Sequence, residues 1–249
     1  MKSTLSMRIG NFLYKHAFPL YRPLYGAFKR RQDAQEIAMM KRVVKPGDVV
    51  LDIGSNIGFY SRLLSDLVGP TGKVHCFEPD RDNFARLREA LQGRSNVVLN
   101  HAAVSDKSGE ITLYTSHRLN VDHRTYQPEQ YDSSYTVPAV RIDDYLPSPA
   151  RVNFIKMDIQ GAEYLAIRGM EQLLQRSTRV AMIFELAPEF LQQCSGVSDT
   201  EMLQLLQRLG LTASQFTETG IHQGKIEYPS AAGADIYANL FAVKTETQA

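Results

Sequence analysis

The feature that most constrains this chain is an apolar run that ends in a glycine turn, Val49-Val50-Leu51-Asp52-Ile53-Gly54-Ser55-Asn56-Ile57-Gly58. The apolar part is typical of a strand buried on both faces. The residues after Gly58 have the pattern of a helix. A strand, a tight turn and a helix in this order present free backbone N–H groups to a ligand. The stretch therefore predicts a ligand site at the carboxyl end of a parallel strand.

The spacing of the two glycines narrows the class of ligand. It is G-x-x-x-G, which differs from the G-x-G-x-x-G of dinucleotide-binding folds and from the G-x-x-x-x-G-K-[ST] of phosphate loops. Asp52 would repel a pyrophosphate but attract a cation, and Gly54 leaves no side chain between backbone and ligand. S-adenosylmethionine carries an ammonium and a sulfonium, so we interpret the stretch as a methyl-donor pocket. The alternative is an ordinary tight turn with a solvated aspartate.

Composition bounds the class of protein. The chain has 249 residues, 43% of them hydrophobic, which is enough for one large α/β domain. A net charge of +1 favours no nucleic-acid partner. The two cysteines, Cys76 and Cys194, lie in or beside apolar segments and are expected to be free thiols in a reducing compartment. No spacing of cysteine and histidine suggests a metal site.

The charge is unevenly distributed, because residues 1–45 hold ten lysines and arginines against two acidic residues. This leaves a net charge of +8 there and −7 in residues 46–249. We expect a helical extension over residues 1–45, split by Pro19 and Pro23, and a catalytic domain over 46–249. The extension is either an amphipathic basic element that touches a membrane or an anionic glycolipid, or a packing helix that lids the domain with its charges in water. We favour the second, since charge runs are usually solvated faces.

The expected localisation depends on the lengths of the apolar runs. None approaches the ~20 residues that a helix needs to cross a bilayer. The N-terminus also lacks a convincing signal peptide, because charged residues and a proline interrupt any apolar segment. We therefore expect a cytoplasmic protein, at most peripheral to the inner face of a membrane.

An acidic residue follows the second expected strand. Residues 73–77 are typical of a strand and end in Glu78, 26 residues after Asp52. A carboxylate at this place binds ribose hydroxyls in nucleoside-binding α/β folds, although it can also serve as a partner for a helix N-terminus. After a third strand, the small Ala102 and Ala103 would let an adenine lie against the backbone. Asp106 either reads the amino group of that adenine or simply turns the chain.

A second strand–Asp–Gly–helix unit occupies residues 152–163 and contains Asp158. We expect its strand to be the fourth parallel one, next to the first across the topological switch point, where ligands bind in open sheets. Asp158 would then face the same crevice as Asp52 and Gly54. Further strands are expected at 110–114, 135–140, 180–184, 211–216 and 237–243. Their order predicts a seven-stranded, mostly parallel sheet with an antiparallel last strand.

The chain resembles the FkbM-type S-adenosylmethionine-dependent methyltransferases over about residues 45–245. The resemblance rests on the segments 52–58, Glu78-Pro79, 103–109, 141–144 and 155–163. It implies a class I, Rossmann-like fold, S-adenosylmethionine as cofactor, and methyl transfer to a hydroxyl of a sugar, glycolipid or natural product. Members of the family typically carry glutamate where this chain has Gln160, which bears on the choice of the catalytic base.

Methyl transfer to a hydroxyl calls for a general base. Asp158 is the first candidate, and its rival role is to bind the methionine ammonium. Glu163 and Glu185 are candidates for orienting the base or for holding a divalent ion. His222 is a candidate base on a loop, as are His117 and His123. No metal is assigned. The residues expected to bind the cofactor are Asp52, Gly54, Ser55, Asn56, Gly58, Glu78, Ala102, Ala103, Asp106 and Asp158.

Rival functions stay open at this point. A nucleotide-dependent oxidoreductase is disfavoured by the glycine spacing. A non-catalytic protein that binds S-adenosylmethionine, or a membrane-associated interaction protein, is disfavoured by the carboxylates beyond the cofactor site and would give no turnover of labelled cofactor. A protein or RNA methyltransferase is the rival within the enzymes, and the acidic body disfavours RNA. We expect a small-molecule or glycan hydroxyl as acceptor. The sequence makes no prediction about the oligomeric state.

Overall fold

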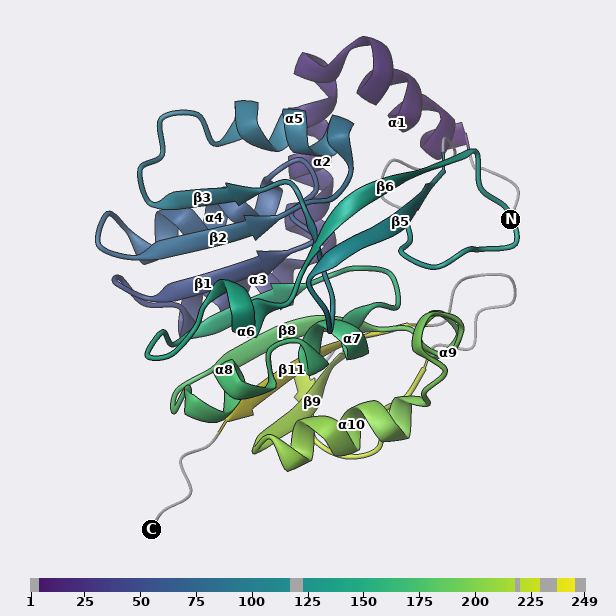
Figure 1. Cartoon of the computed structure of the whole chain (residues 1–249). Coiled ribbons are helices and arrows are strands. Elements are labelled where there is room, and N and C mark those ends of the chain that lie inside the picture. Colours follow the sequence, from purple (N-terminus) through teal and green to yellow (C-terminus); the bar gives the residue numbers. More distant parts are fainter. Residues whose placement is uncertain (1–4, 117–122, 218–219, 229–236, 245–249) are drawn as a thin grey trace.

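A computed structural model describes residues 5–116, 123–217, 220–228 and 237–244. In these residues the main sheet has eight strands in the order β10-β9-β11-β8-β7-β1-β2-β3 (Figure 1). Its parallel part consists of β1 (Val49–Ile53), β2 (Lys73–Phe77), β3 (Val97–Asn100), β7 (Phe154–Met157) and β8 (Ala181–Leu186). The strand that ends before Asp158 lies beside β1, as the sequence predicts. The fold class expected from the sequence is thereby confirmed.

The C-terminal strands give the sheet its antiparallel part. They are β9 (Leu211–Thr217), β10 (Gly220–His222) and β11 (Ala238–Lys244). Strand β11 pairs antiparallel with both β8 and β9. The sequence predicts seven strands, and the eighth is β10, which pairs with β9 at the sheet edge where a loop was expected.

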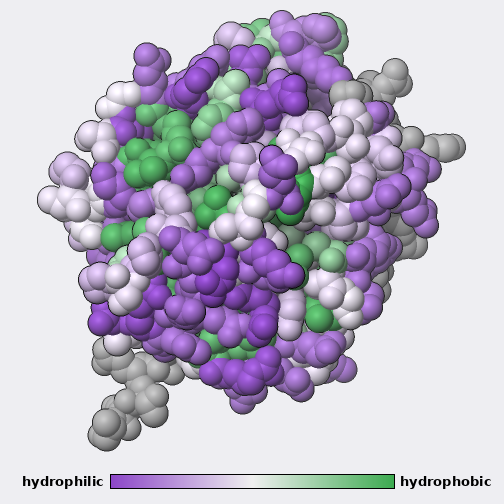
Figure 2. Space-filling model, viewed as in Figure 1, coloured by the Kyte–Doolittle hydropathy of each residue, from purple (hydrophilic) through white to green (hydrophobic). Residues whose placement is uncertain are grey.

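Helices cover both faces of the main sheet. On one face lie α3 (Ala34–Val43), α4 (Phe59–Val68) and α5 (Arg81–Ala90), with Met40, Leu64 and Leu87 in the core. On the other lie α6 (Ile142–Tyr145), α7 (Glu163–Arg168), α8 (Glu171–Arg176), α9 (Pro188–Ser195) and α10 (Asp199–Arg208). The outer surface over α8 and α10 is hydrophilic (Figure 2), as expected of helices that bury one apolar side.

A small second sheet lies at the carboxyl ends of the parallel strands. It has the order β4-β6-β5 and is formed by β4 (Ala103–Val104), β5 (Gly109–Thr115) and β6 (Ser133–Val140). Figure 1 shows the β5–β6 hairpin beside the arrowheads of β1 to β3. The strands predicted at 110–114 and 135–140 are confirmed. His117, a candidate in the connecting loop, lies outside the described residues.

The N-terminal extension is helical, as predicted, and packs onto the domain. It contains α1 (Leu5–His16) and α2 (Phe18–Gln32), followed by α3. The helical segment is interrupted at Ala17, between α1 and α2. Pro19 lies in the first turn of α2, where a backbone N–H has no partner within the helix, so its absence costs nothing. The prediction that Pro23 splits the segment is wrong, because α2 continues through it. Phe18 and Tyr21 of α2 pack against Ile57 of the glycine turn.

The helices of the described ranges include none that is both long enough and apolar enough to span a membrane.

Candidate active site

A cavity of about 500 Å³ lies at the carboxyl ends of β1, β2 and β7, within the ~300–1,000 Å³ range of ligand pockets. Among the residues proposed from the sequence to bind a cofactor, seven line it: Gly54, Ser55, Asn56, Glu78, Ala102, Ala103 and Asp158. Asp52, Gly58 and Asp106 do not line it, and neither do Glu163 and His222. The structure therefore brings together the ends of three strands.

The glycine turn after β1 is held by backbone contacts. The N–H groups of Gly54 and Ser55 both donate to the carbonyl of Phe77 at 3.0 Å. Gly54 has φ +81°, and a Cβ built on it would lie 2.0 Å from the carbonyl oxygen of Asp158. A glycine is therefore required for the two strand ends to approach one another, which is a different reason from the ligand space expected from the sequence.

Gly58 also serves packing. It has φ +85°, and a Cβ there would lie 3.0 Å from Cδ1 of Leu87 in α5. Since positive φ is costly for residues with a side chain, Gly58 lets α4 begin tightly beneath α5.

Asp52 lies beneath the cavity instead of facing it. It is fully buried in β1, and its Oδ2 accepts from Ser61 Oγ of α4 at 2.5 Å, while its Oδ1 has no hydrogen-bond partner. Burial raises the pKa of Asp52, and the ammonium of Lys156 offsets part of that effect. Asp52 and Lys156 are register partners on adjacent strands, so their side chains share one face of the sheet.

Glu78 connects the glycine turn to the start of α5. Its Oε2 accepts from the N–H of Asn56 at 2.7 Å, and its Oε1 accepts from the N–H of Asp80 at 2.9 Å. Burial raises the pKa of Glu78 to about 8, although both hydrogen bonds act in the opposite direction. Ala102 and Ala103 line the same cavity and are nearly fully buried, so this part of the wall is flat and apolar.

Asp158 forms the charged part of the cavity with Lys156. Its Oδ2 lies 3.2 Å from Lys156 Nζ, and its Oδ1 accepts from Gln160 Nε2 at 3.2 Å. Burial by itself would raise the pKa of Asp158, but the ammonium groups of Lys156 and Lys29 outweigh it and hold that pKa below its usual range. Sequence reasoning missed Lys156. The K-x-D spacing could have predicted that Lys156 lies beside Asp158, because residues two apart on a strand point to the same side.

Two further carboxyl groups lie near Asp158 but differ in what they contact. Glu163 accepts from the N–H groups of Ile159 at 3.0 Å and Gly161 at 2.9 Å, so both of its oxygens hold the turn after β7. Burial raises the pKa of Glu163 to about 7. Glu185 lines the cavity at the end of β8. Burial, and then the negative charges of Asp158 and Glu163, raise its pKa to about 9.

Helix α2 supplies a wall of the cavity that the sequence did not predict. Tyr25, Phe28, Lys29 and Gln32 line it. Lys29 Nζ lies 2.5 Å from Asp33 Oδ2, and the hydroxyl of Tyr60 donates to the same oxygen. The ring of Tyr60 lies 4.8 Å from Lys156 Nζ. The extension therefore contributes charge to the site, and local sequence patterns carry no signal for that placement.

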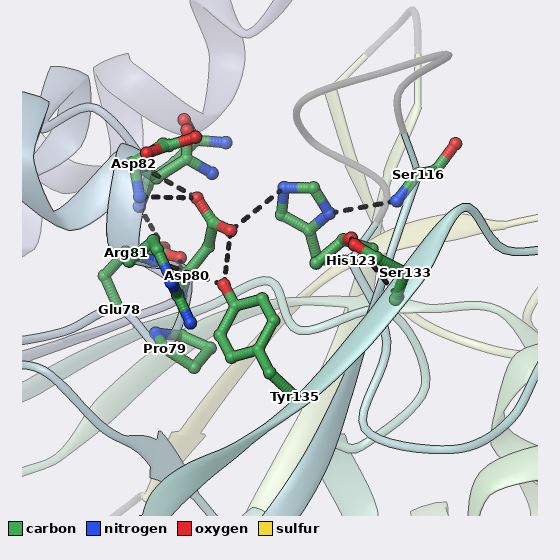
Figure 3. Close-up of polar contacts among 12 residues, drawn as sticks. Glu78, Pro79, Asp80, Arg81, Asp82, Ser116, His123, Ser133 and Tyr135 are labelled. Carbon is green, nitrogen blue, oxygen red and sulfur yellow. Dashed lines mark hydrogen bonds and ion pairs between the residues drawn. The ribbon is translucent and has the colours of Figure 1, made fainter.

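The histidine candidates lie at different places. His222 is exposed on the edge strand β10. His123 lines the cavity, and its Nε2 lies 3.8 Å from Asp80 Oδ2, while its Nδ1 accepts from Ser116 N at 3.4 Å (Figure 3). Tyr135 of β6 also donates to Asp80 Oδ2 at 2.7 Å. Asp80 thus ties the β5–β6 hairpin and its loop to the start of α5, beside Glu78.

Residues 52–211 match the model of the Methyltransferase FkbM domain family. The chain belongs to this family. The matched residues include the glycine turn, Glu78 and Asp158. These are the ends of β1, β2 and β7 that line the cavity.

Known relatives agree with this assignment at low identity. The chain is similar to 2-O-methyltransferase NoeI of Sinorhizobium fredii (31% identical; 53% of this chain and 61% of the relative). It is also similar to 31-O-demethyl-FK506 methyltransferase FkbM of Streptomyces tacrolimicus (28% identical; 51% and 61%). The chain thus spans about three fifths of the length of these relatives. A solved structure of a proposed rRNA methylase from Clostridium thermocellum has the same fold, with 12% identity, 86% and 96% coverage and a TM-score of 0.53.

Proposed function

We propose that this protein transfers a methyl group from S-adenosylmethionine to a hydroxyl of a small molecule or glycan. The observation that carries the proposal is the arrangement of the cavity within an FkbM-family domain: a buried carboxyl and a flat apolar wall after β2 and β3, and an ionised carboxylate after β7. Strands β2 and β7 flank β1 on opposite sides, and neighbouring strands lie ~4.8 Å apart. The two carboxyl groups are therefore separated by about two strand spacings.

The residues present fit this cofactor. Glu78 would hydrogen-bond ribose hydroxyls through its carboxyl group, and Ala102 and Ala103 leave room for an adenine. Binding of the cationic methionine end is the rival role of the ionised Asp158. S-adenosylmethionine supplies an activated methyl group on a sulfonium, and the protein has to hold an acceptor oxygen in line with it.

We assign the general base to Asp158. Its side chain is 38% exposed and lines the cavity, and its lowered pKa keeps it ionised at neutral pH. Glu185 is the rival, because it lines the same cavity but holds its proton up to a pKa of about 9. Glu163 is assigned a positioning role, since both of its oxygens hold the turn that carries Gln160.

The acceptor is inferred from the walls around Asp158 and from the relatives. Tyr25, Phe28, Phe190 and Tyr237 give that part of the cavity an aromatic lining, and such walls pack on the apolar faces of sugar rings and natural products. The names of both relatives describe O-methylation. These two observations favour a hydroxyl acceptor over RNA or protein.

The test is incubation of the purified protein and a small-molecule extract with S-adenosylmethionine that carries a deuterated methyl group, followed by mass spectrometry. A product heavier by one labelled methyl group supports the proposal, and an Asp158→Asn protein is the matched control for adventitious labelling. Calorimetry with S-adenosylhomocysteine and with NAD tests the cofactor separately. Binding of NAD in preference to S-adenosylhomocysteine would overturn the proposal.

A further inference from the structure

Exposed hydrophobic side chains concentrate on the N-terminal helices. Across the described residues, four of the seven exposed large hydrophobic side chains lie on α1 and α2: Phe12 (62% exposed), Leu20 (62%), Leu24 (60%) and Phe28 (60%). The last three follow one another at intervals of four, so they lie on one face of α2. Pro19, Pro23 and Ala27 are exposed on the same helix. We call Pro19, Leu20, Pro23, Leu24, Ala27 and Phe28 the α2 stripe.

The opposite side of α2 is already occupied. Phe18 and Tyr21 are buried against the domain, and Gly26 lies close to Phe59 of α4. The helix is therefore apolar on its inner side and on its outer side. Exposed apolar side chains that follow one another along a helix mark an interaction site, and within the described residues Leu20, Leu24 and Phe28 stay 60–62% exposed.

Cations flank the stripe. Lys15 is exposed just before α2, Arg30 and Arg31 are exposed at its end, and Lys41 and Arg42 are exposed on α3. Residues 1–32 contain no aspartate and no glutamate. An apolar helix face bordered by lysine and arginine is the composition that binds the interface of an anionic bilayer. The extension packs on the domain with Arg30 and Arg31 in water, as expected, and the exposed apolar side chains of α2 are an addition to that expectation.

The positive charge around the α2 stripe distinguishes between two partners that could cover it, a second copy of the chain and a lipid bilayer. Two copies of this chain that met through the α2 stripe would bring two basic surfaces together, and like charges across an interface oppose association. An anionic lipid surface has the complementary sign. The charge thus favours a bilayer over a second copy of the chain.

We propose that the α2 stripe inserts into the headgroup region of an anionic membrane, with Lys15, Arg30 and Arg31 on lipid phosphates. Phe28 belongs to the stripe and also lines the cavity, so a protein bound in this way has its cavity beside the lipid surface. If the proposed function holds, the acceptor is then a hydroxyl compound carried by a lipid. Membrane binding itself does not depend on that function.

The experiment is sedimentation of the whole chain with phosphatidylglycerol/phosphatidylcholine vesicles and with pure phosphatidylcholine vesicles, at low and high salt. We expect binding to the anionic vesicles only, weakened by salt because exposed charges are screened. Leu20→Ser with Leu24→Ser removes apolar contacts and should lower the affinity at least about tenfold. Arg30→Gln with Arg31→Gln should lower it by about fivefold for each cation removed.

The control is Ile221→Ser, which removes an exposed hydrophobic side chain from β10 and should bind vesicles as the wild type does. Thermal unfolding and S-adenosylhomocysteine binding show whether each variant is folded. If the leucine variant does not fold, the arginine variant and the salt dependence decide. Absence of wild-type binding to anionic vesicles at low salt overturns the proposal. So does a dimer in analytical ultracentrifugation that the leucine variant dissociates while vesicle binding is unchanged.

A failed methyl-transfer assay with intact vesicle binding would count against the proposed function alone. Loss of vesicle binding with intact transfer to a soluble acceptor would count against the membrane proposal alone.

Discussion

Gly54 and Asp158 are in contact through their backbones, so that a Cβ on Gly54 would lie 2.0 Å from the carbonyl oxygen of Asp158. The N–H of Asp158 also donates to the carbonyl of Ile53 at 3.0 Å. These contacts join the carboxyl ends of β1 and β7. The turn proposed to hold the cofactor and the carboxylate proposed as base are therefore positioned together.

Replacing Gly54 by alanine should destabilise the fold as well as the site. A side chain at positive φ costs ~1–2 kcal/mol, and the collision with Asp158 adds ~1–3 kcal/mol. Gly93→Ala is the matched control, since Gly93 has φ +80° and open space around the position of a Cβ. Chemical denaturation of both variants measures the difference. Equal destabilisation of the two would show that the contact with Asp158 carries no cost.

Glu78→Gln should weaken the binding of S-adenosylhomocysteine by ~0.5–1.5 kcal/mol, the range for a hydrogen bond between neutral groups, because burial raises the pKa of Glu78 to about 8 and keeps its carboxyl protonated at neutral pH. Glutamine keeps one acceptor for the N–H of Asn56 or of Asp80, so most of the turn should persist. Calorimetry measures the affinity, and thermal unfolding reports damage to the turn. Glu110→Gln on the exposed surface of β5 is the control. Unchanged affinity would remove Glu78 from the site.

Asp158→Asn should lower methyl transfer by ~10²–10⁴-fold if Asp158 is the base, with a small change in cofactor affinity. A parallel fall in affinity would instead assign it to the methionine ammonium.

The pH profile of methyl transfer distinguishes Asp158 from Glu185 as the base. With Asp158 as base, kcat/KM should be level at neutral pH and fall only in acid, because its pKa is lowered. With Glu185 as base, kcat/KM should rise up to a pKa of about 9, and Glu185→Gln should abolish that rise.

Gln160→Glu introduces beside Asp158 the glutamate that the family resemblance implies. Gln160 Nε2 now donates to Asp158 Oδ1 at 3.2 Å, and a carboxylate there would replace a donor by a like charge. The pKa of Asp158 should rise, and the acid limb of the pH–rate profile should move to higher pH. A profile identical to that of the wild type would mean that residue 160 has no electrostatic influence on the base.

Stability should fall as the pH rises through the range of the buried glutamates. Burial raises the folded-state pKa of Glu163 to about 7, of Glu78 to about 8 and of Glu185 to about 9, from an unfolded value of ~4.3. The folded state therefore binds more protons above pH ~4.3, so the stabilisation is complete below that pH and is lost by pH ~9.

The measurement is the free energy of unfolding as a function of pH. Glu163→Gln should flatten the curve between about pH 4.3 and 7, even though it is itself destabilising. The exposed Glu110→Gln should leave the shape unchanged. A free energy of unfolding that rises from pH 5 to pH 9 would contradict the raised pKa values.

Local patterns in the sequence were enough to predict the strands of the main sheet apart from β10, the glycine turn, and the positions of Glu78 and Asp158 after their strands. Each depends on a local pattern: an apolar run marks a buried strand, and the residue that follows it lies at the edge of the sheet where ligands bind. The spacing of apolar residues likewise predicted the helical extension, although α2 continues through Pro23.

Which of these residues come into contact follows from how the strands and helices pack together. Lys156 lies beside both Asp52 and Asp158 because β1 and β7 pair in one register. Asp52 lies under α4 because its side chain points to the face of the sheet that α3, α4 and α5 cover. Helix α2 covers the cavity because Phe18 and Tyr21 pack on Ile57. Such contacts join residues far apart in the chain, and they depend on how whole faces pack, which local spacing does not encode.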